Sequence, residues 1–156
     1  MTEVTEKARH MIKICPANVD NPSEHCVNVK ALFDTGAAAS YVNRDIAEKL
    51  HKEGAFIVPI KPQEIGTAIE GQTAIVRDGI FVKFLIENCD ITQYESAGVH
   101  ILEKASEEAV IGLRDMQFYG IELDIKNAKI KIPECPPKFN IGSSSEMPRK
   151  KVIAIE

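Results

Sequence analysis

The chain has 156 residues, which suits one domain with a hydrophobic core. Its net charge of −4 leaves no basic surplus to neutralise phosphates, so we expect no nucleic-acid partner. No apolar run reaches the roughly 18 residues of a membrane span, so we expect no membrane partner either.

Strand-like runs dominate the sequence, because short stretches alternate polar and apolar residues or are rich in β-branched and aromatic side chains. These runs are 10–15, 25–33, 74–76, 80–86, 97–102 and 129–132. Two short helices are predicted between them. Asn43 is a suitable N-cap for a helix over 44–51 with Ile46, Ala47 and Leu50 on its buried face, and a second helix over 113–119 should stop at Gly120.

Many short strands with two short helices predict a mostly-β, barrel-like fold with one domain per chain. We place the domain at residues 10–136, after a flexible N-terminus at 1–9. Residues 137–156 have the composition of a linker-like tail, because prolines and the run Gly142-Ser143-Ser144-Ser145 bury too little apolar surface to offset the entropy of ordering. The N-terminus lacks the apolar core of a signal peptide, which favours a cytoplasmic location, with the nucleus as the alternative.

The most informative segment is ALFDTGAAAS, in which an apolar strand runs directly into Asp34, Thr35 and Gly36. Burying a lone carboxylate is costly, so a strand that ends this way calls for a reason. On its own the tripeptide would be read as a turn, since turns favour Asp and Gly. A plain turn is expected between polar flanks, however, whereas this one lies between apolar residues and an alanine run.

Together with the downstream Ala109-Val110-Ile111-Gly112, this segment resembles the retroviral-type (retropepsin-like) aspartic proteases. The pattern is two apolar residues, Asp-Thr/Ser-Gly-Ala, and later two apolar residues and a glycine. The stretches SYVNRDIAEKL and VIGLRDMQFYGIELD look most like the peptidases of LTR retrotransposons and their domesticated relatives. The resemblance covers about residues 10–133 and implies a retropepsin-like closed barrel that hydrolyses peptide bonds without a cofactor.

The resemblance also implies roles for individual residues. Asp34 matches the catalytic carboxylate, Thr35 the residue that bonds across a dimer, and Gly36 the glycine that approaches substrate. The substrate-binding residues implied are Ala37, Ala38 and Ile111, together with Ile69, Glu70 and Gly71 at the tip of a flap hairpin within 64–76. Two departures stand out: many viral members carry acidic residues where this chain has Ala38 and Ala39, and the Asp often found two residues after the downstream glycine is here Arg114, followed by Asp115.

This route to hydrolysis needs two carboxylates facing one water, and the chain has one Asp-Thr-Gly. A homodimer would supply the pair by symmetry, with an extended peptide or protein substrate lying across the axis. We expect Thr35 and the strands 10–15 and 129–132 to contribute to the dimer. The alternative is a non-catalytic dimerisation or peptide-binding module with the same fold, and a third reading is a part of a retroelement polyprotein.

The cysteines and histidines show no metal-ligand spacing, so we expect no metal. Without a secretion signal, Cys15, Cys26, Cys89 and Cys135 are expected to be reduced thiols in the core or at strand edges.

Overall fold

A computed structural model describes residues 7–67, 71–86, 89–90, 97–133 and 150–154 of the chain. Its elements are the strands β1 (Lys7–Pro16), β2 (Val27–Asp34), β3 (Tyr41–Asn43), β4 (Ile57–Gly66), β5 (Thr73–Ile86), β6 (Cys89–Asp90), β7 (Ala97–Leu102), β8 (Ala109–Gly112), β9 (Glu122–Asp124), β10 (Lys129–Pro133) and β11 (Lys150–Ala154), the α-helices α1 (Arg44–Lys52) and α2 (Leu113–Tyr119), and the 3₁₀ turn η2 (Pro22–Glu24). None of the described helices is long and apolar enough to cross a membrane.

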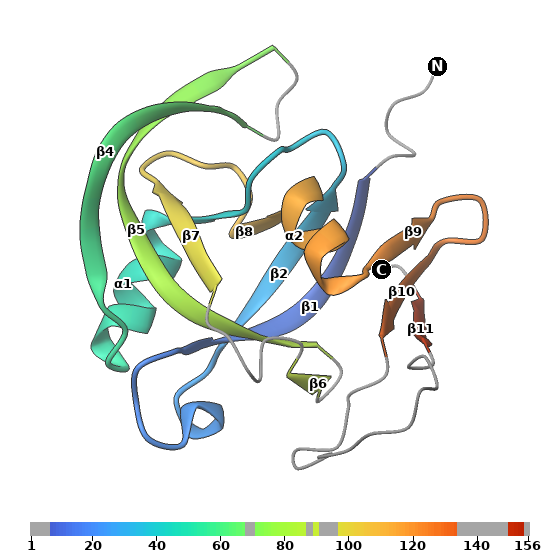
Figure 1. Cartoon of the computed structure of the whole chain (residues 1–156), viewed down its shortest axis with the longest axis horizontal. Helices are drawn as coiled ribbons and strands as arrows, with labels where there is room; N and C mark the ends of the chain where they lie inside the picture. The colour runs from blue at the N-terminus through green and yellow to red at the C-terminus, as the bar shows by residue number, and fades with distance from the viewer. Residues whose placement is uncertain (1–6, 68–70, 87–88, 91–96, 134–149, 155–156) are drawn as a thin grey trace.

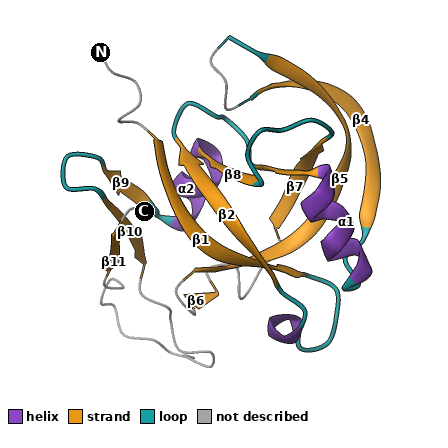
Figure 2. Ribbon diagram, turned by 180° about the vertical axis from the view of Figure 1, so that it is seen from behind, coloured by secondary structure: helices purple, strands orange, loops and turns teal. Residues whose placement is uncertain are grey.

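The large sheet closes on itself. Its strand order is β1-β2-β8-β3-β7-β5-β4, and β1 also pairs with β5 through Lys13–Pro16, which joins the two sides of the sheet. Two parallel pairings, β2 with β8 and β3 with β7, lie within an otherwise antiparallel arrangement. Strands β4 and β5 form a long curved hairpin along one side, and a small sheet of order β11-β10-β9 lies on the opposite side (Figure 1, Figure 2). The predicted mostly-β, barrel-like fold with two short helices is confirmed.

One core joins both sheets and both helices. Apolar side chains from β1, β2, β5, β7 and β8 form its centre, and α1 covers it with Ile46, Ala47 and Leu50. Ile130 and Ile132 of β10 reach the same core, as the alternation of Lys129-Ile130-Lys131-Ile132 requires. The small sheet is therefore part of the same domain.

Both α-helices begin where the sequence places them. The Asn43 side chain accepts a hydrogen bond from the Ile46 N–H at 2.8 Å, which satisfies one of the free donors at the start of α1. Helix α2 ends at Gly120, whose φ of 71° lies in the left-handed region. Arg44, at the start of α1, ties the helix to the barrel through ion pairs with Asp78 on β5 and with Glu103 just after β7. The hydrogen bond to Glu103, which has the largest effect, and the one to Asp78 raise the pKa of Arg44 above its ordinary value.

Several strands differ from prediction. Strand β4 was not predicted, and the two runs at 74–76 and 80–86 form the single strand β5. Strand β1 begins at Lys7, inside the predicted flexible N-terminus, and residues 150–154 of the predicted tail pair with β10 as β11. Residues 137–149 of the predicted linker-like tail lie outside the described residues, and the domain limits stay a prediction.

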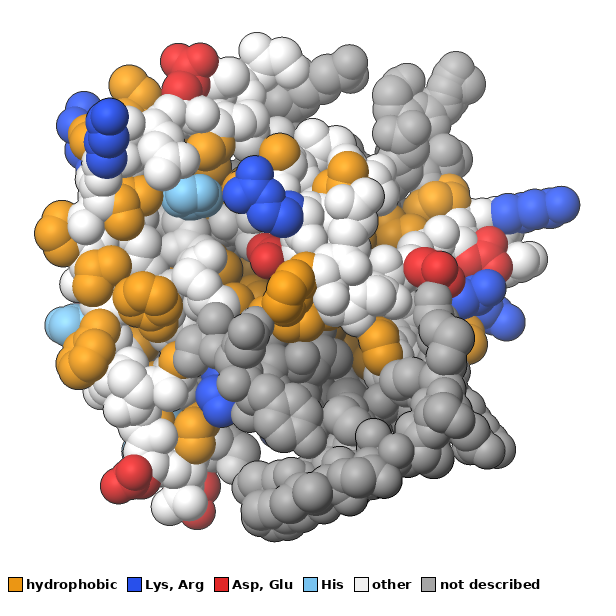
Figure 3. All heavy atoms as spheres, in the orientation of Figure 1, with side chains coloured by type: hydrophobic (Ala, Val, Ile, Leu, Met, Phe, Trp, Pro, Cys, Tyr) orange, Lys and Arg blue, Asp and Glu red, His pale blue; other side chains and the backbone are white. Residues whose placement is uncertain are grey.

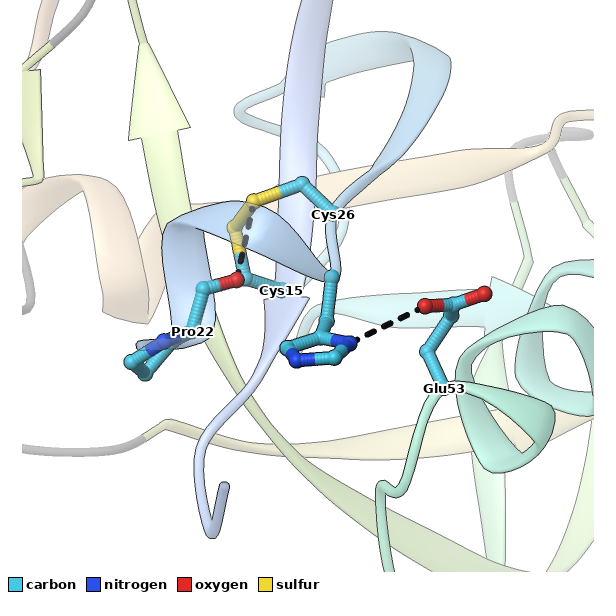
Figure 4. Close-up of a disulfide and its surroundings, with 5 residues drawn as sticks. Cys15, Pro22, Cys26 and Glu53 are labelled. Carbon is cyan, nitrogen blue, oxygen red and sulfur yellow. Dashed lines mark hydrogen bonds and ion pairs between the residues drawn. A yellow bond between two sulfur atoms is a disulfide. The ribbon is translucent and has the colours of Figure 1, made fainter. Parts of the chain in front are cut away.

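The expectation of reduced cysteines is wrong for one pair, since Cys15 and Cys26 form a disulfide (Figure 4). The two residues flank the connection between β1 and β2. Ile14 lies opposite Val27 in this antiparallel pair, so Cys15, which follows Ile14, lies opposite Cys26, which precedes Val27. Their Cα atoms are 4.1 Å apart. The same connection docks on the end of α1 through His25 and Glu53, whose side chains are 3.2 Å apart. The side chains of Cys89 and Cys135 lie outside the described residues.

Candidate active site

Asp34 is the last residue of β2 and only 5% exposed. The strand alternates at first and then becomes fully buried over Ala31, Leu32 and Phe33, so it carries the carboxylate to the edge of the barrel interior. Because burial of a carboxylate is costly, the groups that surround Asp34 need to be described.

The loop after Asp34 turns back on the carboxylate. The Gly36 N–H donates to Asp34 Oδ1 at 2.9 Å, and the Ala37 N–H donates to the Asp34 carbonyl at 3.1 Å. A Cβ on Gly36 would lie 3.1 Å from Asp34 Oδ1, so a side chain there would crowd the carboxylate. Thr35 and Gly36 are exposed on the single chain while Ala37 is buried, so the loop presents its first two residues outward.

The end of strand β8 and the start of helix α2 pack against this loop and hydrogen-bond to it. Gly112 lies opposite Asp34 in the parallel pairing of β2 with β8. A Cβ on Gly112 would come within 2.7 Å of the Ala39 carbonyl carbon and 2.8 Å of the Ala37 oxygen, so only glycine fits. Immediately after it, the Leu113 N–H donates to the Ala37 oxygen at 2.7 Å. Gly112 of the sequence motif thus packs against the Asp34 loop.

A second connection was missed by sequence reasoning. The hydroxyl of Ser40, which is 3% exposed, accepts a hydrogen bond from the Gly112 N–H at 2.9 Å and donates one to Asp115 Oδ2. The Arg114 N–H donates to the Ala38 oxygen at 3.3 Å. Asp115 is therefore hydrogen-bonded to the loop that follows Asp34.

The β4–β5 hairpin packs on the residues that flank Asp34. Val76 of β5 belongs to one apolar cluster with Leu32 and Ala37, and Ile65 and Ala74 of the hairpin pack against that cluster. Gly66 and Thr73 are the last paired residues of the hairpin, and beyond them the Thr67 N–H donates to the Gln72 oxygen at 3.0 Å. The predicted hairpin is therefore present at the predicted place.

The structure describes only some of the residues that were predicted to bind substrate. Ile69 and Glu70 lie outside the described residues, and Gly71 is exposed with a φ of 79°. Ile111 is 2% exposed and belongs to the main core, so the structure does not place it on the face of the sheet that carries Asp34. Its neighbour Val110 belongs to the cluster with Leu32, which shares the face of β2 that Asp34 uses.

His100 on β7 lies beside this network. Its backbone N–H donates to the Ser40 oxygen at 3.3 Å. Burial, followed by the positive charge of Arg114, lowers the pKa of His100 below its ordinary value of 6.5, and the negative charge of Asp115 acts in the opposite direction. His100 also lines a cavity of about 200 Å³ between β4, β5 and β7, none of whose lining residues belongs to the Asp34 loop. In the view of Figure 3, apolar side chains gather at the left of the molecule, where β4 and β5 lie in Figure 1.

In the described part of the chain, no group of three or more His, Cys, Asp or Glu side chains is placed to hold a metal ion. The polar groups at the site are the Asp34 carboxylate and the backbone groups of the loop that follows it.

No protein-family model matches the chain, and no curated protein matches it. Among solved structures, the chain is similar to the crystal structure of the retroviral protease-like domain of Ddi1 from Leishmania major. The two share 16% sequence identity over 80% of this chain and 83% of that chain, with a TM-score of 0.49.

Proposed function

We propose that the chain is an aspartic endopeptidase, in which two Asp34 carboxylates, one from each chain of a homodimer, activate a water for attack on a peptide bond. The observation that carries the proposal is the buried Asp34 at the end of β2, held by its own loop and by Gly112. The sequence resemblance to retropepsin-like proteases, and most closely to those of LTR retrotransposons, points to the same chemistry.

The reaction divides the work between two identical side chains. One carboxylate takes a proton from the water while the other, protonated, polarises the scissile carbonyl. Two adjacent carboxylates cannot both be charged, so the pair shares one proton. We therefore expect an acidic activity optimum, and a pH–rate profile that still rises well into the alkaline range would contradict the shared proton.

The homodimer follows from the count of one Asp-Thr-Gly per chain. The exposure of Thr35 and Gly36 on the single chain is consistent with a partner loop that covers them. The proposed contribution of strand 129–132 needs revision, because β10 is already paired with β9 on one side and β11 on the other. The outer strands of the small sheet, β9 and β11, and the first half of β1, whose described pairing with β5 begins only at Lys13, are better candidates for the shared sheet.

The substrate would be an extended peptide held between the Asp34 loop and the β4–β5 hairpin. The hairpin supports this role because its side chains already pack against Leu32 and Ala37, which flank the carboxylate. Gly71, with its positive φ, and the flanking strands are suited to a hairpin that opens and closes over a substrate. Ala38 is exposed on the loop that follows Asp34 and presents no charged side chain there.

Hydrolysis of a peptide library by the purified dimer tests the proposal, with Asp34→Asn as the critical variant. Asp20→Asn is a matched control, since Asp20 is an exposed carboxylate on the β1–β2 connection. We expect Asp34→Asn to abolish cleavage with the fold intact and Asp20→Asn to cleave like the wild type. An inactive wild type that still binds a statine-type transition-state analogue as a dimer would instead favour the non-catalytic peptide-binding module. A cytoplasmic or nuclear location stays a prediction. Disulfides such as Cys15–Cys26 are rare in both compartments, which are reducing.

A further inference from the structure

The Ser40 hydroxyl connects three segments that are far apart in the sequence. It lies 2.9 Å from the Gly112 nitrogen of β8 and is hydrogen-bonded to Asp115 of α2, and it belongs to the loop that follows Asp34. Ser40 is 3% exposed, while Asp115 is half-buried. The connection therefore lies inside the molecule, directly beneath the proposed catalytic loop.

The directions of these bonds are fixed by the number of protons. A hydroxyl has one proton, and because the Gly112 N–H donates to Ser40 Oγ, the hydroxyl proton is free to go to Asp115. A bond from a hydroxyl to a carboxylate is stronger than one between neutral groups. Asp115 thus orients the Ser40 hydroxyl. In this orientation a lone pair of Ser40 Oγ faces the Gly112 N–H.

Gly112 is the residue that faces Asp34 across the parallel strand pair. Next to it, the N–H groups of Leu113 and Arg114 donate to the Ala37 and Ala38 oxygens of the catalytic loop. The loop is therefore attached to the start of α2 both through these N–H groups and through the Ser40–Asp115 bond. A shift of Gly112 would move the loop that carries the carboxylate.

We propose that Ser40 and Asp115 act as one pair of positioning residues that sets the Asp34 loop for catalysis. The proposal rests on the proposed protease function, because it assigns the pair an effect on turnover. Because Ser40 is buried and Asp115 is half-buried, we expect neither side chain to contact substrate. Their loss should then lower kcat and leave KM within about threefold of wild type, since misplacement of a reacting group by as little as about 1 Å costs up to about a hundredfold in rate.

A purely structural role would give a different pattern. A buried hydroxyl that only satisfies its neighbours would, when removed, weaken the whole fold and raise amide exchange everywhere. A positioning pair should instead act locally, and its two members should not be additive. The Asn43–Ile46 cap bond at the start of α1 is a useful internal control, because the Ile46 N–H donates to the Asn43 side chain and not to Ser40 or Asp115.

The test compares Ser40→Ala, Asp115→Ala, the double variant and Asp115→Asn with the wild-type dimer. Asp115→Asn is the conservative variant, because its amide oxygen still accepts the Ser40 hydroxyl. We expect a fall in kcat of about tenfold to a hundredfold for each alanine variant, no further fall in the double variant, and kcat within about threefold of wild type for Asp115→Asn. In Ser40→Ala, amide exchange measured by NMR should be faster at Gly112 and unchanged at Ile46.

Three outcomes would each overturn the proposed positioning role of the pair. They are losses in kcat that multiply in the double variant, an unchanged kcat in Ser40→Ala, and an equal acceleration of amide exchange at Gly112 and Ile46. The exchange measurement needs no activity. If the wild-type chain cleaves no peptide, the proposed function fails, and the exchange at Gly112 in Ser40→Ala and Asp115→Asn still decides whether the two side chains hold the loop.

Discussion

Asp34 and Gly112 lie opposite one another on two parallel strands, and the loop after Asp34 passes so close to Gly112 that no Cβ fits there. The contacts a Cβ would make are with backbone atoms of Ala37 and Ala39, which cannot rotate away as the end of a side chain can. The carboxylate and the glycine of the two sequence motifs are therefore one structural unit.

Gly112→Ala should destabilise the fold and abolish peptide hydrolysis. Overpacking of this kind costs typically about 1–3 kcal/mol in the free energy of unfolding, and here it also displaces the loop that carries Asp34. Urea unfolding and a cleavage assay measure the two effects. Gly66→Ala is the matched control, because a Cβ on Gly66 meets nothing within 4 Å, and it should change the free energy of unfolding by less than about 0.5 kcal/mol. An active, stable Gly112→Ala protein would contradict the close approach seen here.

Local signals in the sequence were sufficient for the helices. Asn43 caps α1 as its position predicts, and Gly120 ends α2 with a positive φ, because both depend on residues within one turn of the helix end. Asp34 could be singled out for a similar reason, since an apolar strand that ends in Asp-Thr-Gly is unusual over five residues.

Features that depend on pairing between distant segments were harder to predict. Strand β4 was missed because Pro59 and Pro62 interrupt it, yet it is the outer strand of the sheet, where proline is tolerated. Ser40 and Asp115 are 75 residues apart, and nothing in either local sequence indicates their hydrogen bond. The disulfide had a usable signal, since pairing the predicted strands at 10–15 and 25–33 as a hairpin would have placed Cys15 beside Cys26.

The disulfide should stabilise the fold measurably. Closing a loop with a sequence separation of 11 lowers the entropy of the unfolded chain and is worth about 3 kcal/mol on the chain-entropy estimate. A reductant should therefore lower the urea midpoint of the wild-type protein, and mass spectrometry after thiol labelling should show Cys15 and Cys26 become reactive together. The Cys15→Ser, Cys26→Ser double variant is the control, and its midpoint should be insensitive to reductant. A wild-type midpoint that also ignores reductant would show that the bond does not form or does not matter.

His100 should make the protein less stable in acid. Its pKa in the folded chain is lowered by burial and by Arg114, so the unfolded chain binds the proton more readily. The free energy of unfolding should thus fall as the pH drops below about 6.5 and stop falling, for this group, below the folded-state pKa. His100→Gln removes this effect, so the urea midpoint of the wild type should fall relative to that of the variant as the pH is lowered from 7.5 to 5. Curves that stay parallel over that range would exclude a role for His100.

Thr35 should contribute to the dimer rather than to the fold of the single chain. It is exposed on the described chain, next to Asp34, at the position where the resemblance implies a hydrogen bond across the dimer axis to the partner loop. Thr35→Val keeps the shape and deletes the hydroxyl. Each bond lost should weaken the dimer by about 0.5–1.5 kcal/mol, and more if the partner groups stay buried and unpaired. In the proposed symmetric dimer, two such bonds would be lost at once.

Sedimentation across a dilution series measures this change directly, with peptide hydrolysis followed at the same concentrations. Wild-type activity should fall faster than linearly on dilution, and Thr35→Val should begin to fall at a higher concentration than the wild type. Thr35→Ser retains the hydroxyl and should dissociate like the wild type, which separates the hydrogen bond from the loss of a methyl group. A monomer that remains fully active well below the dissociation constant of the dimer would overturn the two-chain mechanism, because a single chain contributes one Asp-Thr-Gly and the reaction requires two carboxylates.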